Sequence, residues 1–300
     1  MNRIISSPMP TVPSAKPVES HALLHEMIRS FTTLARTLNL SHAVKELGST
    51  RQTLRRHIAL LEEAKGVSLF EVRDRQYHLT DEGRRALPEA EGILARGNAW
   101  LSGKSSIING LQLLHHVEED GWCHFQHQKP IGRVFSSSGR MLSDVVRAWA
   151  EAGGDLEHEA FQKVRPYCTV NRRHEGNWLF TEVGDKSAYV TWFGWKVARS
   201  SIGRALAQMP GGDGFGRLVN HAYDEIESTQ SMRLDHVFTL FPYGEDKVMT
   251  PVAYERLLLG ARYPDNSFAM ISAARRTYDV EIEGVTNKML RMMPEDMVME

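Results

Sequence analysis

The sequence is poor in cysteine, with only Cys123 and Cys168 among 300 residues. Two thiols this far apart form neither a disulfide framework nor a CxxC pair, so we expect free thiols in a reducing compartment. The sequence also lacks a run of about 20 apolar residues, which a membrane-spanning helix needs. Its opening, MNRIISSPMPTVPSAKP, lacks the apolar stretch of a secretory signal. We therefore expect a cytoplasmic protein without a membrane partner.

Motifs that carry catalysis are absent as well. The sequence contains no GxSxG and no HExxH. The glycine-rich stretch MPGGDGFG, residues 209–216, lacks the Lys-Ser/Thr that completes a phosphate-binding loop, which favours a connector. No nucleophile with a neighbouring base can be named. We expect that the protein is not an enzyme.

Potential metal ligands gather in HHVEEDGWCHFQH, residues 115–127. Histidine and cysteine are ligand types for zinc, but the spacing matches no defined metal motif, and neighbours such as Cys123 and His124 rarely bind one ion together. Single histidines elsewhere give no positive evidence for haem. We therefore expect neither a metal nor another cofactor. The histidines considered are His115, His116, His124 and His127 in the cluster and His158, His174, His221 and His236 outside it.

Charge is distributed unevenly along the chain, although the net charge is only −1. Residues 21–104 contain 13 Lys/Arg and 10 Asp/Glu, whereas residues 105–300 contain 21 and 26. This gradient is compatible with a basic DNA-binding head joined to an acidic body. Residues 1–20 contain four prolines and no apolar periodicity, which predicts a disordered arm.

Helical periodicity begins near position 21 and predicts three short helices in tandem. The first is expected to end at Asn39, Ser41 to cap the second, Gly48 to end it, and Ser49 or Thr50 to begin the third. Each helix has an apolar face that packs against the others. These faces contain Met27, Phe31, Leu34, Ala35 and Leu38 in the first helix, Ala43, Val44 and Leu47 in the second, and Leu54, Ile58 and Leu61 in the third.

A hairpin and a longer helix are predicted next. The stretch GVSLFEVRDRQYHLTDEG, residues 66–83, places apolar residues on both sides of a charged turn at 73–76, as a β-hairpin does. Thr80 then begins a helix that continues toward Trp100 despite Pro88. This helix is expected to connect the head to the rest of the chain.

The first turn of the third helix is polar and basic, and the apolar stripe that follows anchors it. An α-helix fits the major groove of B-DNA, where arginine can bond guanine and glutamine can bond adenine. Exposed basic residues are also common on solvated helix faces, so periodicity alone leaves both interpretations open. In the DNA-binding interpretation, base edges contact Arg51, Gln52, Thr53 and Arg55, and phosphates or the minor groove contact Thr50, Arg56, Arg73 and Arg75.

The order of these parts resembles the winged helix-turn-helix of LysR-type transcriptional regulators. That pattern has a small residue and Leu in the second helix, a reading helix that ends in RxLE, then GxxLFxR and LTxxG. This chain has HAVKELGSTRQTLRRHIALLEEAKGVSLFEVRDRQYHLTDEG at 42–83. It departs from the pattern at Arg51, Gln52, Arg55 and Val72, which puts the operator sequence in doubt but not the fold. The agreeing positions are Ala43, Leu47, Thr50, Leu54, Arg56, Ile58, Leu61, Glu62, Leu69, Phe70, Leu79, Thr80 and Gly83.

The resemblance covers about a quarter of the chain and implies a domain organisation for it. Residues 21–82 would be a mainly α winged helix-turn-helix domain that binds double-stranded DNA. Residues 83–104 would be a linker helix through which two copies pair, so the expected assembly is a homodimer or higher homo-oligomer.

The remaining residues predict an α+β domain with an antiparallel sheet. Residues 105–119 and 141–153 are predicted as helices, which makes residues 105–139 a helical connector. Strands are predicted at 174–184 and 187–194, followed by a helix at 214–230. Three final strands are predicted from 235 to 276, with PDNS as a turn between the last two.

Two strands, helices and three strands is the order of a PAS-type sensor domain, and short strings such as YERLLL and FAMISAARR are similar to a PAS-like group. We therefore expect residues 140–300 to be PAS-like and to sense a small-molecule effector, with Trp192, Phe193 and Trp195 lining its cavity. Aromatic residues in strands are also common in an ordinary core. Two alternatives are a periplasmic-binding-type effector domain of two α/β lobes and a protein-interaction module that binds no ligand.

Overall fold

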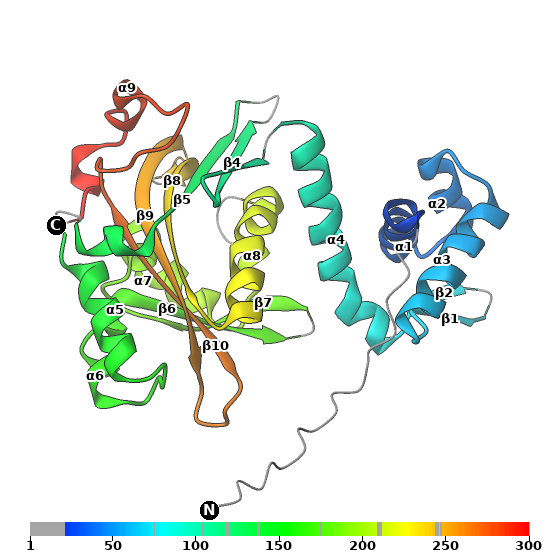
Figure 1. Cartoon of the computed structure of the whole chain (residues 1–300), viewed down its shortest axis with the longest axis horizontal. Coiled ribbons are helices and arrows are strands. Elements are labelled where there is room, and N and C mark those ends of the chain that lie inside the picture. The colour runs from blue at the N-terminus through cyan, green and yellow to red at the C-terminus, as the bar shows by residue number, and fades with distance from the viewer. Residues whose placement is uncertain are drawn as a thin grey trace, which may run out of the picture. The chain divides into compact units, whose positions relative to one another are not determined.

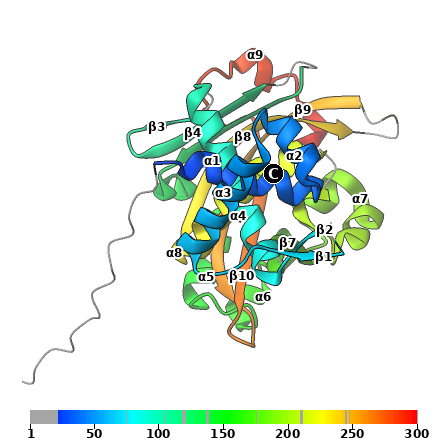
Figure 2. The same cartoon turned by 90° about the vertical axis from the view of Figure 1, so that its right-hand side faces the viewer.

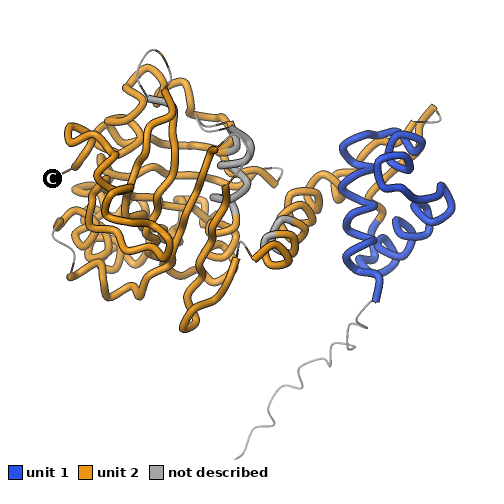
Figure 3. The backbone as a smooth tube through the Cα atoms, turned by 90° about the horizontal axis from the view of Figure 1, so that it is seen from above, with its two compact units in different colours: residues 1–67 blue, residues 68–300 orange. Residues whose placement is uncertain are grey.

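The computed structural model describes residues 22–74, 76–103, 105–117, 121–136, 139–174, 176–208, 212–243, 246 and 248–299. The chain divides into two compact units, residues 1–67 and residues 68–300 (Figure 3). The arm expected at residues 1–20 lies outside the described residues. No helix in the described ranges is both long and apolar enough to cross a membrane.

The described part of the first unit contains three helices, α1 (Leu24–Thr37), α2 (Leu40–Leu47) and α3 (Arg51–Lys65), and α1 packs against both others. The predicted third helix and its cap are confirmed. The predicted boundary between the first two helices is wrong, because Leu38 adopts a left-handed conformation that ends α1 at Thr37. Asn39 then caps α2 in place of Ser41, and its side chain accepts hydrogen bonds from the backbone N–H groups of Ser41 and His42.

The second unit begins with the predicted hairpin, β1 (Phe70–Arg73) and β2 (Gln76–Leu79), and continues into α4 (Asp81–Leu101). Thr80 caps α4 as predicted, by accepting a hydrogen bond from the backbone N–H of Gly83. Glycine is required there, since a β-carbon on Gly83 would lie 2.1 Å from the carbonyl oxygen of Leu69. The hairpin is thus packed closely onto the start of the linker helix.

The body of the second unit is built on one eight-stranded sheet (Figure 1). All its strand pairs are antiparallel, in the order β3-β4-β5-β8-β9-β10-β6-β7. The long hairpin of β9 and β10 lies in the middle of the sheet (Figure 2). The strands are β3 (Ser105–Ile108), β4 (Leu111–Val117), β5 (Cys123–Lys129), β6 (Cys168–His174), β7 (Asn177–Val183), β8 (Met232–Tyr243), β9 (Val248–Arg262) and β10 (Phe268–Arg276).

Helices cover both faces of this sheet and enclose two apolar cores. Because side chains alternate along a strand, one face presents Leu257 and Ile271 to α5 and α6, while the other presents Leu258 and Met270 to α7 and α8. The helices are α5 (Met141–Glu151), α6 (Glu159–Gln162), α7 (Ala188–Ser201), α8 (Gly212–Thr229) and α9 (Asn287–Leu290), with short 3-10 turns at Ile131–Phe135, Arg165–Tyr167, Leu206–Gln208 and Glu295–Met297.

Two predictions for the body are wrong. Residues 105–139 are not a helical connector, because β3 and β4 form a hairpin that turns at Asn109 and Gly110, both with positive φ, and β5 joins them to the main sheet. Residues 187–194 are not a strand, because Ser187 caps the helix α7. The helices near 141–153 and 214–230 and the three final strands are confirmed.

Candidate nucleic-acid interface and ligand cavity

The helix α3 is anchored on its buried side as the apolar pattern predicted. Leu54, Ile58 and Leu61 are each at most 7% exposed. His57 is also buried, and its Nδ1 lies 2.8 Å from Oγ of Ser30 on α1. His57 is not among the predicted core residues, although its position three residues after Leu54 places it on the same face. Apolar packing and a buried hydrogen bond therefore fix α3 against α1.

The opposite side of α3 presents the polar residues proposed to contact DNA. Gln52, Arg55 and Arg56 are exposed, and Thr53 is half-buried. Thr50 accepts a hydrogen bond from the backbone N–H of Thr53 and so serves as the cap. This face of α3 can enter the major groove of DNA without rearrangement of the helix.

Arg51 has a different environment from the other arginines of α3. It is exposed, but its Nη2 donates a hydrogen bond to Oγ of Ser41 on α2, over 2.8 Å. Its guanidinium is therefore held across the gap between α2 and α3. To contact a base with this nitrogen, Arg51 must exchange that bond.

The hairpin supplies the remaining predicted phosphate contacts. Arg73 closes β1, its side chain is 70% exposed, and it forms an ion pair with Glu71 over 2.7 Å. Asp74 at the turn has φ 50°. Arg75 lies outside the described residues. Because an exposed pair of this kind contributes little to stability, Arg73 can exchange Glu71 for another anion.

A cavity of about 120 Å³ lies between the sheet and the helices α7 and α8. Trp192 and Phe193 line it, but as residues of α7 rather than of a strand. Trp195 does not line it and is 52% exposed. It follows Gly194, whose φ of 79° and ψ of 160° interrupt the helix, so its side chain does not continue the inward face.

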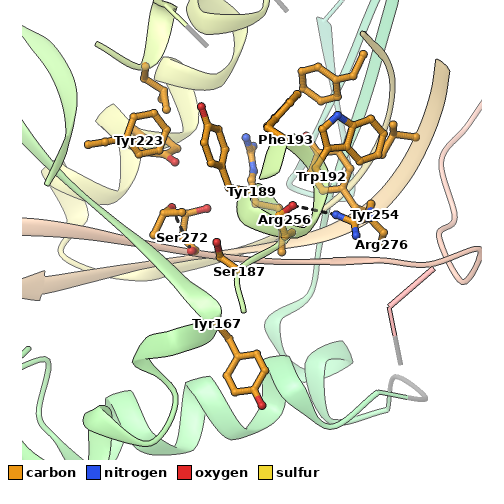
Figure 4. Close-up of a pocket in the computed structure, with 17 residues that line it drawn as sticks. Tyr167, Ser187, Tyr189, Trp192, Phe193, Tyr223, Tyr254, Arg256, Ser272 and Arg276 are labelled. Carbon is orange, nitrogen blue, oxygen red and sulfur yellow. Dashed lines mark hydrogen bonds between the residues drawn. The ribbon is translucent and has the colours of Figure 1, made fainter. Parts of the chain in front are cut away.

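Further side chains from the sheet and from both helices close this cavity (Figure 4). Tyr189, Tyr223 and Tyr254 bring aromatic rings, and Arg256 and Arg276 bring guanidinium groups. These five residues are not among the predicted ligand contacts, because they come from four elements spread over 88 positions. The other lining residues are Tyr167, Thr169, Phe180, Ser187, Ala188, Leu206, Phe241, Val252, Ser272 and Ala274.

A row of buried charged groups leads away from the cavity along the same face of the sheet. Asp235 is fully buried and accepts hydrogen bonds from Arg256 over 2.9 Å and from Arg233 over 2.8 Å. Burial alone would raise the pKa of Asp235, but the two guanidinium groups hold it below its usual value. Arg233 also pairs with Glu225 on α8 and donates to Gln112 on β4. The row thus connects the cavity to the far half of the sheet.

The described histidines of the 115–127 cluster lie on two sides of the sheet. Within the described residues, no group of three or more His, Cys, Asp or Glu side chains could hold an ion. Side chains alternate along a strand, which separates these histidines. His116 lies opposite His124 in the register of β4 and β5 and both face the cavity side of the sheet, while His115 and His127 face the other side. Burial, with a further contribution from Arg256, lowers the pKa of His124 to about 3. This imidazole is therefore neutral at physiological pH.

The comparison with protein families identifies the head. Residues 25–84 match the family described as bacterial regulatory helix-turn-helix protein, lysR family. The probable hydrogen peroxide-inducible genes activator of Mycobacterium xenopi is 33% identical over 85 residues, which are 28% of this chain and 45% of that protein. The HTH-type transcriptional regulator IlvR of Caulobacter vibrioides is 30% identical over 152 residues, which are 49% of this chain and 47% of that protein. The matches thus span less than half the length of each relative.

Solved structures match about a quarter of the chain. The CbnR DNA-binding domain in complex with DNA is 26% identical, with a TM-score of 0.26, and the match covers 26% of this chain and 91% of that one. Oxidized OxyR of Corynebacterium glutamicum is 28% identical, with a TM-score of 0.27 and coverage of 28% and 27%. The family match thus covers α2, α3 and the hairpin of β1 and β2, which carry the residues proposed to contact DNA.

Proposed function

We propose that the whole chain is a transcription regulator that binds a specific site in double-stranded DNA. The observation that carries the proposal is the helix α3 within the lysR-family segment, which is anchored by Leu54 and His57 and exposes Gln52, Arg55 and Arg56. A side chain held on a fixed helix loses little entropy when it contacts a base edge. In this proposal base edges contact Arg51, Gln52, Thr53 and Arg55, and phosphates contact Thr50, Arg56, Arg73 and Arg75.

The linker helix α4 supports pairing of two copies. Ile93, Trp100 and Leu101 are 43%, 71% and 70% exposed, which is unusual for large apolar side chains on one helix. A second copy of α4 would bury them. A two-fold dimer would then bind a site whose two halves are related by the same symmetry.

The body is proposed to be a PAS-like sensor that works, with the head, in the cytoplasm. Two strands (β6 and β7), the helices α7 and α8, and three strands (β8 to β10) follow one another, and these five strands share one antiparallel sheet. The first pair is β6 with β7 and not the predicted 174–184 with 187–194, but the order of strands and helices is that of a PAS-type domain. Two α/β lobes would need separate sheets, so this arrangement favours the PAS-like interpretation. The cavity favours a small-molecule effector over an interaction module with a filled core.

The buried charges provide a route from cavity to linker helix. Arg256 lines the cavity, and Arg233 at the other end of the row contacts Gln112 and Glu225. Gln112 and Glu225, together with Trp100 of α4, line an open groove between α4, β3 and α8. An effector that changes the partners of Arg256 would therefore bias the packing of α4. Control of DNA binding requires that the effector prefer one of two such states.

Selection of duplexes from random oligonucleotides by the full-length protein tests the DNA-binding part. We expect enrichment of a site with two related halves, with footprints spaced by about one helical turn or a multiple of it. Heparin is the matched competitor, because it offers the charge of DNA without base edges. If no duplex is preferred over heparin, the regulator function is wrong.

A further inference from the structure

The cavity combines aromatic walls with positive charge. Of the described residues that line it, Arg256 and Arg276 carry charge and none is acidic. Both are buried, at 4% and 5% exposure. Figure 4 shows the two side chains among Tyr189, Trp192 and Tyr254. A buried guanidinium strongly favours a negatively charged partner, because water is not available to solvate it.

Three oxygen atoms of the protein accept hydrogen bonds from Arg276 and hold its guanidinium at the cavity wall. Its Nε donates to the carbonyl of Met297 over 2.6 Å, Nη1 to the carbonyl of Ala188 over 2.9 Å, and Nη2 to the hydroxyl of Thr191 over 3.0 Å. The group also lies over the ring of Trp192, 5.3 Å from its centroid. These contacts fix the orientation of the positive group before any ligand arrives.

Arg256 supplies a hydrogen-bond donor that no described residue accepts. Its Nη2 is bonded to Asp235 and Gln126, but its Nε is buried and has no hydrogen-bond partner. A buried N–H without an acceptor carries a desolvation cost that no hydrogen bond offsets. An acceptor oxygen on a ligand in the cavity would remove that cost.

The neighbouring tyrosines add no negative charge to the cavity. Burial raises the pKa of Tyr254 to about 12 and raises that of Tyr223 as well. Both phenols are therefore neutral at physiological pH. On β10, Ser272 and Ala274 remain half-buried in a strand whose neighbouring residues are buried, since their side chains face the open space. The size of this space, about 120 Å³, is close to that of cavities that hold one aromatic ring.

We propose that this cavity binds a small aromatic carboxylic acid. Its ring lies against Tyr189, Trp192 and Phe193, and its carboxylate accepts hydrogen bonds from the guanidinium groups of Arg256 and Arg276. The inference rests on the proposed sensor function of the body and specifies the class of its effector.

Calorimetric titration of the full-length protein with two acids and their neutral amides tests the inference. The probes are phenylacetate and 3-phenylpropanoate, compared with phenylacetamide and 3-phenylpropanamide, and cyclohexylacetate tests the need for an aromatic ring. We expect at least one acid to bind at least about tenfold more tightly than its amide, because charge-assisted hydrogen bonds are lost in the amide. We also expect it to bind more tightly than cyclohexylacetate.

Two variants extend the test. Ala274→Leu fills the cavity from the sheet side without removing a polar group, so binding of the acid should fall more than tenfold while the melting temperature does not fall. Arg276→Gln should reduce the ratio of acid to amide affinity toward one. Arg262→Gln, an exposed arginine at the end of β9, is the matched control and should leave the ratio unchanged.

Equal affinity for acids and amides overturns the inference, as does the absence of binding by either acid. Unchanged binding in Ala274→Leu would also overturn it, because the ligand would then lie elsewhere. The same protein preparation is tested for binding to the selected duplex, with and without the acid. Retained DNA binding together with a negative titration rejects only the aromatic-acid inference, whereas loss of DNA binding rejects the regulator function itself.

Discussion

The head and the body use arginine in opposite ways. On α3, Arg55 and Arg56 are exposed above a stripe of buried apolar residues. Among the described residues of the body, four arginines are buried, each at most 5% exposed, and their contacts include buried carboxylates and backbone carbonyls. These four are Arg233, Arg256, Arg275 and Arg276.

This difference in burial determines which arginines can bind DNA and which can bind partners only inside the fold. An exposed guanidinium on a fixed helix exchanges water for the phosphates and base edges of a polyanion with little cost. A buried guanidinium has already lost its water, so its partners determine both the stability of the fold and the ligands that it accepts. Substitutions in the body should therefore change the free energy of unfolding, and substitutions on α3 should change DNA binding.

Asp235→Asn should produce the largest effect, because it leaves Arg233 and Arg256 buried without their shared carboxylate. We expect the body to lose about 3–5 kcal/mol of its free energy of unfolding. Intrinsic tryptophan fluorescence in a denaturant titration measures this loss for the body alone, because all six tryptophans lie between positions 100 and 195.

Asp144→Asn is the matched control for that measurement. Asp144 is exposed and pairs with Arg147 one turn later on α5, over 3.6 Å. Its replacement should change the free energy of unfolding by about 0.5 kcal/mol or less. If the two variants lose the same stability, the buried row of charges has no special role in the body.

The neutral His124 should give the body a pH dependence. Its pKa in the folded state, about 3, lies below the usual value of 6.5 because of burial and of Arg256. Between these two pH values His124 binds more protons in the unfolded state than in the folded state. The contribution of His124 to the free energy of unfolding is therefore fully present above pH 6.5 and is lost as the pH falls toward 3. We expect up to about 1.4 kcal/mol per pH unit from this group between pH 6 and 4.5.

His124→Asn should remove this contribution and flatten the pH profile of unfolding, measured again by tryptophan fluorescence. His174→Asn replaces an exposed histidine in the same sheet and should leave the slope as it is. A wild-type slope that persists in His124→Asn would mean that other groups cause the pH dependence.

The head was predictable from the sequence because its signals are local. The stripe of Leu54, Ile58 and Leu61 and the cap at Thr50 lie within one helix, and the structure contains both. The same holds for the hairpin of β9 and β10 with its PDNS turn. In each case the pattern within a short stretch and the final packing agree.

The cavity was not predictable, because distant strands and helices build it. Two local signals also misled the interpretation. Tyr189 to Phe193 are good strand formers, but Ser187 caps a helix there and packing against β7 and β10 stabilises it. The apolar residues within 105–119 favour one helix by their spacing, although Asn109-Gly110 is a strong hairpin signal. Attention to that dipeptide would have predicted β3 and β4.

On the DNA side, Arg55→Ala should lose about 1–3 kcal/mol of binding free energy on the selected site and much less on random duplex, if Arg55 contacts a base. Arg147→Ala removes an exposed arginine from the body and is the control. The free energy of unfolding should not change in either variant by more than about 0.5 kcal/mol. Equal losses on both duplexes would instead make Arg55 a phosphate contact.

The smallest effect is expected from the hairpin. Arg73 is 70% exposed and already paired with Glu71, so phosphate binding at this position replaces one exposed ion pair by another. Arg73→Ala should weaken binding to selected and random duplexes equally and reduce the slope of log affinity against log salt by about one unit. Glu71→Ala removes the competing carboxylate and should act in the opposite direction, toward tighter binding on both duplexes. If Arg73→Ala discriminates between duplexes, the hairpin reads sequence, and the contrast between base-reading helix and phosphate-binding hairpin has to be redrawn.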